Sequence, residues 1–398
     1  MRILFLNHNI KGVGTYIRCF NFAKHLVRFG HSVVLLTSAS HSIIKPKREM
    51  IDGVEVICMP DIMGKRIRNG GLGPIDTILR CFFLLNRKFD VVENFDHRPA
   101  VLYPALLSKY LLGIPLVSEW TDLHGTGGSL NNRPKVLQHL IKPYEDVTEK
   151  GSKKIPDKLI VISSWLREKA IDIGVPESRI TYIPGGADLD KIIPKPKEEV
   201  RRAYGLPLDK KIIAYTAGTH YDIDLFLRTI YLIQKNRKDV LLVTTGAMFG
   251  NKLKGEVFDP DRIFEFGFLP YERYAALLPA VDVFLFPFAN KTINKARWPN
   301  KIGDYMASGR PIVSNRTGDI VKLFKDHNIG LLASEAPEDF AAKTLELLDN
   351  QKLSSEIGMR ARQTAERYYD WRLLSKKLER CFFELTERHS EKSKADRK

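Results

Sequence analysis

The sequence predicts an α/β protein of two domains, each built on a parallel, doubly wound β-sheet. The length of 398 residues exceeds what one hydrophobic core usually serves. In both halves of the chain, short apolar runs alternate with amphipathic helical segments. A stretch rich in proline, glycine and charge, residues 183–199, separates the two series and is the best linker candidate.

The first domain, residues 1–190, is expected to begin with a buried strand at Arg2–His8 and a helix at Ile17–Phe29. Apolar residues recur in that helix at spacings of three and four, and Gly30 is placed to end it. Further strands are expected in the apolar runs at 30–38, 54–60, 89–95, 114–120 and 157–165.

The second domain, residues 191–365, repeats this alternation. Its expected strands are the apolar runs at 211–218, 239–246, 263–269, 281–288 and 310–315. From Pro337 to Glu387 the pattern is helical. We expect the helix at 366–388 to pack back on the first domain and the polar tail 389–398 to be disordered.

The composition, 44% hydrophobic and 28% charged, is that of a globular protein. Four cysteines form no CxxC pair and no metal-ligand spacing, so disulfides are not expected as the scaffold. The first ten residues lack the features of a signal peptide. The apolar stretch Ala100–Val117 is broken by Lys109 and two prolines, which makes it a poor membrane span. A cytoplasmic protein, soluble or peripheral on a membrane, is therefore expected.

The net charge of +16 favours polyanionic partners, namely nucleic acid, phosphate-bearing substrates or an anionic lipid surface. The surplus is uneven, because residues 1–50 hold eight basic residues and one acidic residue. A solubilising surface explains the charge equally well.

The common nucleotide-binding motifs are incomplete or absent in this sequence. The dinucleotide fingerprint needs a third glycine where Ile17 stands and an acid after the second strand, where Thr37–Ser40 lies. Gly12 and Gly14 still allow the backbone to approach an anion at a helix start, although an ordinary tight turn needs the same glycines. No Walker loop occurs.

The triplets at 188–190 and 222–224 imitate a metal-binding Asp-x-Asp, but such triplets are common in a chain with this much Asp, and no metal site is predicted.

Four stretches, taken in order, resemble the retaining family 4 glycosyltransferases: Gly12–Gly14 with residues 23–38, and then 158–190, 266–287 and 298–320. The resemblance implies the GT-B architecture, in which two Rossmann-like domains face a cleft. It also implies that the first domain binds the acceptor and the second binds a nucleotide sugar.

For the donor, the resemblance points to the segment Pro299–Ser308. A proline and an asparagine precede a short helix there, so the first amide groups would point freely toward a diphosphate. Asp304 matches the family's ribose-binding acid. The candidate donor-binding residues are Gly12, Gly14, Gly218, Arg297, Asn300, Lys301, Ile302 and Asp304.

The chain departs from the family pattern at two places. The family's Glu, seven residues, Glu motif would fall on Ala296 and Asp304, so its first acid is missing. The Arg and Lys that usually follow the first strand of the second domain are absent from residues 218–222. Lys295, Arg297 and Lys301 are the nearest substitutes, and catalysis is weak or absent if none of them reaches the phosphates.

In the first domain, Asp122 aligns with the aspartate of the family's His-Asp pair and is the leading catalytic candidate. His124 is an alternative acid or base, because its intrinsic pKa lies near neutrality, but a structural histidine fits the sequence as well. Glu119 and the pair Asp96-His97 end neighbouring strands and are weaker candidates.

The predicted reaction moves a sugar from a nucleoside diphosphate sugar to a hydroxyl of a glycan or lipid-linked acceptor, with retention at the anomeric carbon and without metal or cofactor. Lys65, Arg66 and Arg68 suggest contact with an anionic membrane surface, on the inner face of the cell membrane. Three alternatives remain open: a nucleotide-sugar binder without turnover, a GT-B isomerase or epimerase that needs no acceptor, and a nucleic-acid-binding protein. No recognised motif supports the last, so no nucleic acid partner is expected.

Overall fold

The computed structural model describes residues 1–132, 134–217, 222–246, 248–249 and 258–395. Contacts divide the chain into two compact units. The N-terminal unit comprises Met1–Pro184, Ala296–Trp298 and the chain from Trp371 onward, and the C-terminal unit comprises Gly185–Lys295 and Pro299–Asp370.

The expected domain boundaries, after 190 and after 365, are thus displaced to 184 and 370. The first shift arises because the last strand of the N-terminal sheet ends at Tyr182, and the chain leaves that unit two residues later. The second arises because Trp371 is buried in the N-terminal core, whereas the preceding turn at Ala365–Tyr369 belongs to the C-terminal unit.

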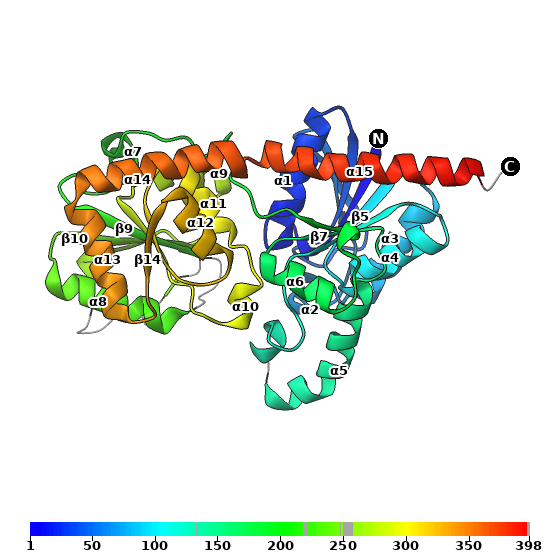
Figure 1. Cartoon of the computed structure of the whole chain (residues 1–398), viewed down its shortest axis with the longest axis horizontal. Coiled ribbons are helices and arrows are strands. Elements are labelled where there is room, and N and C mark those ends of the chain that lie inside the picture. Colours follow the sequence, from blue (N-terminus) through cyan, green and yellow to red (C-terminus); the bar gives the residue numbers. More distant parts are fainter. Residues whose placement is uncertain (133, 218–221, 247, 250–257, 396–398) are drawn as a thin grey trace. The chain divides into compact units, whose positions relative to one another are not determined.

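Within the described residues, the N-terminal unit contains an eight-stranded sheet in the order β3-β4-β2-β1-β5-β6-β7-β8 (Figure 1). The strands are β1 (Arg2–Ile10), β2 (Ser32–Ser38), β3 (Lys47–Ile51), β4 (Val54–Met59), β5 (Val91–Phe95), β6 (Leu116–Trp120), β7 (Lys158–Val161) and β8 (Ile180–Tyr182). The strand order reverses at β1, which is the doubly wound pattern that gathers ligand-binding residues at the carboxyl ends of the strands.

One strand of this sheet was not expected. β3 pairs antiparallel with β4 through a tight turn at Asp52 and Gly53, both of which have positive φ. Its residues Lys47–Ile51 are mostly exposed and charged, so the segment carries no apolar run that could identify it. Charged, solvated residues suit a strand at the edge of a sheet.

Helices cover both faces of the N-terminal sheet: α1 (Thr15–Arg28), α2 (Lys65–Asn69), α3 (Pro74–Leu85), α4 (Pro99–Tyr110), α5 (Lys135–Ser152), α6 (Ser164–Asp172) and α15 (Trp371–Ala395). Alternate residues of β1 divide between the two cores. Ile3 and Phe5 pack with α1 and α15, whereas Leu4 and Leu6 pack with α3 and α4. A strand buried on both faces reads as the continuous apolar run seen in the sequence.

The last helix lies along α1 (Figure 1). Its side chains Trp371, Leu378 and Phe382 are buried in the same core as Phe5 and Phe22. The helix continues to Ala395, so the expected disordered tail from 389 is corrected as far as that residue. Residues 389–395 contain Glu, Lys and Ala but neither glycine nor proline, which lets the helix continue.

The described part of the C-terminal unit contains a six-stranded parallel sheet in the order β11-β10-β9-β12-β13-β14. The strands are β9 (Lys211–Ala217), β10 (Val240–Gly246), β11 (Ile263–Glu265), β12 (Val283–Phe286), β13 (Ile312–Asn315) and β14 (Gly330–Ala333). The helices are α7 (Lys197–Tyr204), α8 (Ile223–Asn236), α9 (Tyr271–Leu277), α10 (Thr292–Lys295), α11 (Asn300–Ala307), α12 (Asp319–His327), α13 (Pro337–Asp349) and α14 (Gln351–Thr364). The predicted fold class, two Rossmann-like parallel-sheet units, is confirmed.

The predicted membrane-facing cluster on α2 needs a correction. Arg68 is 5% exposed, and its guanidinium donates hydrogen bonds to Ser42 Oγ (2.9 Å), to Ser40 O (3.2 Å) and to Met63 O. It therefore stabilises the loop before α2 and cannot meet a lipid surface, whereas Lys65 and Arg66 are exposed. Among the helices described, none is long and apolar enough to cross a bilayer.

Candidate active site

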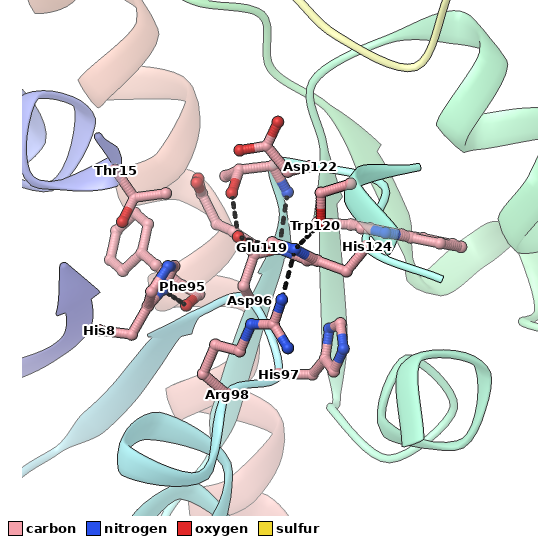
Figure 2. A network of polar contacts seen from close by, with 12 residues as sticks. His8, Thr15, Phe95, Asp96, His97, Arg98, Glu119, Trp120, Asp122 and His124 are labelled. Carbon is pink, nitrogen blue, oxygen red and sulfur yellow. Dashed lines mark hydrogen bonds and ion pairs between the residues drawn. The ribbon is translucent and has the colours of Figure 1, made fainter. Parts of the chain in front are cut away.

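Polar side chains gather where β1, β5 and β6 end in the N-terminal unit (Figure 2). Asp96 directly follows β5, has φ of 70° and is fully buried. Its Oδ2 accepts a hydrogen bond from Thr121 Oγ1 at 2.6 Å, and its Oδ1 accepts from the Thr121 amide at 3.3 Å. These bonds join the segment after β5 to the segment after β6.

His124 lies at the centre of this polar cluster (Figure 2). Its Nδ1 is 2.8 Å from an Arg98 guanidinium nitrogen, and its Nε2 is 3.4 Å from Asp96 Oδ2. These two contacts hold the imidazole ring between the Arg98 guanidinium and the Asp96 carboxylate.

The charges of the cluster are mutually compensated. Burial alone would raise the pKa of Asp96, but His124 and the buried Lys153 outweigh it and hold that pKa well below its ordinary value. Burial lowers the pKa of His8 to about 4 and that of His97 to about 3. Both histidines are therefore neutral near pH 7.

α5 supports this cluster with two acids, Glu145 and Glu149. The Glu149 carboxylate accepts hydrogen bonds from Trp120 Nε1 (3.0 Å), the His124 amide (3.0 Å) and the Gly125 amide (2.8 Å). Glu145 accepts from Arg98 at 2.6 Å. Burial opposes ionisation of Glu145, but His97 and Arg98 lower its pKa to about 2.

Sequence reasoning missed Arg98, Glu145 and Glu149. The two acids stand four residues apart on one helix face, a pattern equally typical of a solvated surface. Their partners are between 24 and 48 residues away in sequence, so no local signal could identify them.

Glu119, a weaker candidate, is fully buried and has a structural partner. Arg18 holds its carboxylate in a two-bond fork at 2.6 and 2.9 Å and also donates to the Ile183 and Pro184 carbonyls, both at 2.8 Å. Burial raises the pKa of Glu119 although Arg18 opposes this. Glu119 therefore fixes the end of β6 and does not line an open site.

The leading catalytic candidate, Asp122, is brought next to a residue predicted for the donor. Arg297 Nε lies 3.1 Å from Asp122 Oδ1, and the Asp122 side chain is 37% exposed. By its contacts the short segment Ala296–Trp298 belongs to the N-terminal unit, where Ser163 Oγ donates to the Ala296 carbonyl at 2.9 Å. Arg297 thus pairs with a carboxylate, although the sequence suggested a role as a phosphate-binding cation.

In the C-terminal unit, Asp304 lies one turn into α11. Its Oδ2 accepts a hydrogen bond from the Tyr274 hydroxyl at 2.9 Å and is 3.7 Å from Lys301 Nζ. Lys301 Nζ also lies 4.0 Å from the centre of the Tyr274 ring. Burial raises the pKa of Asp304, with Lys301 opposing, and burial lowers the pKa of Lys301.

The start of α11 corrects one predicted donor contact. The Ile302 amide donates to the Pro299 carbonyl at 3.1 Å, because the first turn of the helix is tight, so this amide is not free for a ligand. In the described part of the chain, the amides of Asn300 and Lys301 have no acceptor. Gly303 is required for packing, because a Cβ there would lie 2.3 Å from the Gly186 carbonyl oxygen.

The glycine loop before α1 is mainly a turn. Gly12 and Gly14 have positive φ, and a Cβ on Gly14 would lie 2.3 Å from Asn9 Oδ1. Asn9 Oδ1 accepts from the Thr15 amide at 2.8 Å, and the next two amides donate to Val13 and Gly14 carbonyls. Thus the first amides of α1 are already used. Gly218 lies outside the described residues.

Two parallel-sheet Rossmann-like units, in a chain with neither a Walker loop nor a complete dinucleotide fingerprint, have the architecture of the GT-B class. The chain belongs to the family 4 glycosyltransferases: the family model described as "Glycosyltransferase Family 4" matches residues 10–191, and the model described as "Glycosyl transferases group 1" matches residues 210–350. It is a glycosyltransferase of the kind that uses nucleotide sugars.

Similar proteins agree with this assignment. D-inositol 3-phosphate glycosyltransferase of Corynebacterium urealyticum is 24% identical over 400 residues, covering 92% of this chain and 89% of that protein. Sucrose-phosphate synthase from Thermosynechococcus elongatus superposes with a TM-score of 0.76 at 15% identity, covering 96% and 98% of the two chains. Anabaena HepE in complex with UDP-glucose gives a TM-score of 0.71 at 14% identity, covering 97% and 100%.

Proposed function

We propose that the protein transfers a sugar from a nucleoside diphosphate sugar to a hydroxyl acceptor with retention at the anomeric carbon. The observation that carries this proposal is the geometry of α11. Asp304 lies one turn beyond two amides, of Asn300 and Lys301, that have no acceptor in the described residues. An acid and free helix amides at this spacing suit a ribose and its attached diphosphate.

Asp304 has one oxygen available for the ribose. Tyr274 and Lys301 both contact Oδ2, and Oδ1 has no contact in the described part of the unit. The amides and the Lys301 ammonium stabilise the negative charge that develops on the departing diphosphate. This stabilisation is expected to be the largest contribution to the rate.

Of the two predicted catalytic residues, Asp122 suits contact with substrate better. Both ring nitrogens of His124 face protein groups, so His124 orients the segment that carries Asp122. Arg297 orients the Asp122 carboxylate, and Asp122 then accepts a hydrogen bond from a hydroxyl of the reacting sugar or acceptor. The leaving phosphate takes the acceptor's proton, on the same face of the sugar.

The acceptor is a glycan or lipid-linked hydroxyl presented at an anionic membrane surface on the cytoplasmic side. The exposed Lys65 and Arg66 of α2 and the net charge of +16 support this part of the proposal. Replacing both residues with glutamine is expected to weaken binding to anionic vesicles.

A second candidate, a nucleotide-sugar binder without turnover, is favoured by one observation. Ala296 stands where the family has its first acid, and its side chain is fully buried.

A binding panel followed by a turnover assay separates the two functions. UDP, GDP, ADP and dTDP, and the glucose ester of each, are tested for a rise in the melting temperature of the protein. A ligand that binds only the folded state produces such a rise. The ligand that binds is then incubated with the enzyme and an extract of polar lipids, and the anomeric configuration of the product is read by NMR. Binding without nucleotide release would establish the inactive binder, and no binding by any nucleotide would overturn both.

A further inference from the structure

A polar hollow of about 670 Å³ lies on the C-terminal unit, where α12, α14 and the turn Ala365–Tyr369 meet. Its walls come from the last turn of α12, the end of α14 and three consecutive residues of the turn. This volume is typical of sites for small molecules, which measure roughly 300–1,000 Å³. Among the described candidate donor-binding residues, none lines the hollow, so it is separate from the site assigned to the donor.

The turn Ala365–Tyr369 is a π-helical turn, a rare conformation that is found frequently at functional sites. It brings Glu366, Arg367 and Tyr368 to the wall of the hollow. Tyr368 is 48% exposed, and its ring centre lies 4.9 Å from that of His327 at the end of α12. These two rings give the hollow an aromatic side.

The acids of the hollow are neutralised by cations that lie outside it. Asp326 Oδ2 is 2.8 Å from Lys322 Nζ, one turn earlier on α12. Glu366 Oε1 accepts a hydrogen bond from Arg362 Nε at 2.6 Å. Neither Lys322 nor Arg362 lines the hollow. The two carboxylates therefore do not require the arginines of the hollow as partners.

The two arginines of the hollow differ in their partners. Arg360 donates a hydrogen bond to Glu356 Oε2, one turn earlier on α14, at 3.2 Å. The exposed Arg367 has neither an ion pair nor a hydrogen bond within the part of the chain that the structure describes. A guanidinium can hold two oxygens of a phosphate in a fork. Arg367 is thus available to an anionic group of a ligand.

The other lining groups suit hydroxyls and a ring. The Gln363 amide and the Glu366 carboxylate can exchange hydrogen bonds with hydroxyl groups. The Tyr368 ring offers an apolar face to the C–H groups of a sugar ring. No aliphatic side chain among the described residues lines the hollow, which disfavours an apolar ligand.

We propose that this hollow binds a phosphorylated sugar, whose phosphate lies on Arg367 and whose ring lies against Tyr368. Gln363 and Glu366 then bind the sugar hydroxyls. A bare phosphate is a poorer occupant, because it would leave the aromatic side and the amide unused. It is therefore one outcome of the test.

Arg362 links the hollow to α11, the helix assigned to the donor. Besides Glu366, its guanidinium donates to the Ala307 carbonyl at the end of α11 (2.8 Å) and to the Ile192 carbonyl (2.9 Å). The π-helical turn also contacts α11, and α14 lies beside it (Figure 1). A ligand held by Glu366 is thus connected to α11 through a single side chain. We expect the sugar phosphate to alter donor affinity, and this part of the proposal rests on the proposed function.

The first test is calorimetric titration of the full chain with glucose 6-phosphate, and separately with glucose and with inorganic phosphate. We expect glucose 6-phosphate to bind, and each component to bind about tenfold more weakly, because it meets only part of the lining. Arg367→Gln removes no contact within the described protein and should weaken glucose 6-phosphate binding about tenfold. Tyr368→Leu should weaken it about fivefold. The matched control, Lys352→Gln, removes an exposed positive charge of α14 outside the hollow and should bind like the wild type.

The second test is titration with UDP-glucose, with and without saturating glucose 6-phosphate. We expect the UDP-glucose affinity of the wild type to change about fivefold or more, the usual range of coupling between two sites. Linkage requires that UDP-glucose change the affinity for glucose 6-phosphate by the same factor. Arg367→Gln should bind UDP-glucose normally and lose the response.

The remaining outcomes have defined meanings. Absence of glucose 6-phosphate binding, or equal binding by the wild type and Arg367→Gln, would overturn the site. Inorganic phosphate that binds as tightly as glucose 6-phosphate would make the hollow a plain anion site and overturn the assignment to a sugar. Binding at the hollow with an unchanged UDP-glucose affinity would overturn the link to the donor. If glucose 6-phosphate binds through Arg367 and no nucleotide sugar binds, the site stands and the proposed function fails.

Discussion

The acids of the N-terminal polar cluster and Asp304 of the C-terminal unit are held in opposite ways. In the N-terminal unit, Asp96 and Glu145 are surrounded by cations and N–H donors, and their pKa values lie below the ordinary range despite burial. In the C-terminal unit, Asp304 has one lysine and one tyrosine as neighbours, and burial raises its pKa. The first set of charges stabilises the fold, whereas the charge on Asp304 opposes it. A destabilising charge is what a group reserved for a ligand is expected to carry.

The strongest test of this contrast removes a support in the N-terminal unit. Glu149→Ala leaves the Trp120, His124 and Gly125 donors without an acceptor in a buried place. We expect a stability loss of about 3–5 kcal/mol, seen as a lower urea midpoint, and a fall in kcat. UDP-glucose binding, which is assigned to the other unit, should be unchanged at a temperature where the variant is folded. Glu149→Gln keeps one acceptor oxygen and should lose less.

Acidification tests the N-terminal side of this contrast. The pKa of His8 falls from 6.5 in the unfolded chain to about 4 in the folded one, so the unfolded state binds more protons between these values. The contribution of His8 to the free energy of unfolding is then fully present above pH 6.5. It is lost as the pH falls toward 4, by about 1.4 kcal/mol per pH unit.

Urea unfolding of the wild type and of His8→Asn across this pH range measures the effect. The slope for the variant should be smaller. Parallel slopes would contradict the assignment of the loss to His8.

Asp304 should respond in the opposite sense. Because its pKa is raised in the folded state, Asp304→Asn is expected to leave the melting temperature unchanged or higher. The same substitution should weaken nucleotide-sugar binding by about 2–3 kcal/mol, or roughly 100-fold, in calorimetric titration. Asp326→Asn, which removes an exposed acid of the same unit, serves as the control. A large loss of stability with intact binding would reverse the contrast.

The smallest effect is expected at the Asp122–Arg297 pair. The partly exposed Asp122 limits the coupling energy of the pair to about 1 kcal/mol or less. A double-mutant cycle of Asp122→Asn and Arg297→Gln measures it by urea unfolding. In turnover, Asp122→Asn should lower kcat more than Arg297→Gln does. Equal effects would mean that Asp122 acts only as the partner of Arg297.

Much of the fold could be predicted because parallel strands buried on both faces leave continuous apolar runs in the sequence. The runs containing Phe5 and Val283 identify central strands in this way. β3 could not be identified because its residues are charged and exposed at a sheet edge. The helix end at 389 was wrong because polarity was interpreted as disorder, although Glu and Lys also favour helices.

For the candidate site, sequence could indicate positions but not partners. Asp122 and His124 follow the end of a strand, where parallel sheets of this kind bind ligands, so the sequence could identify them as candidates. The pairing of Asp122 with Arg297 joins residues 175 apart, and no local pattern encodes it. The use of the Ile302 amide depends on how tightly the first turn of α11 winds, which residue types alone do not determine.

The burial of α15 against α1 gives this enzyme an unusual order of assembly during synthesis. The N-terminal unit begins the chain, yet its core lacks Trp371, Leu378 and Phe382 until the final helix has left the ribosome. About 200 residues separate the end of the N-terminal sheet from that helix, so translation at ordinary speed imposes a wait on the order of 10–40 s. During that interval the apolar side chains of α1 that pack against α15 stay uncovered, and the C-terminal unit is free to complete its own core first.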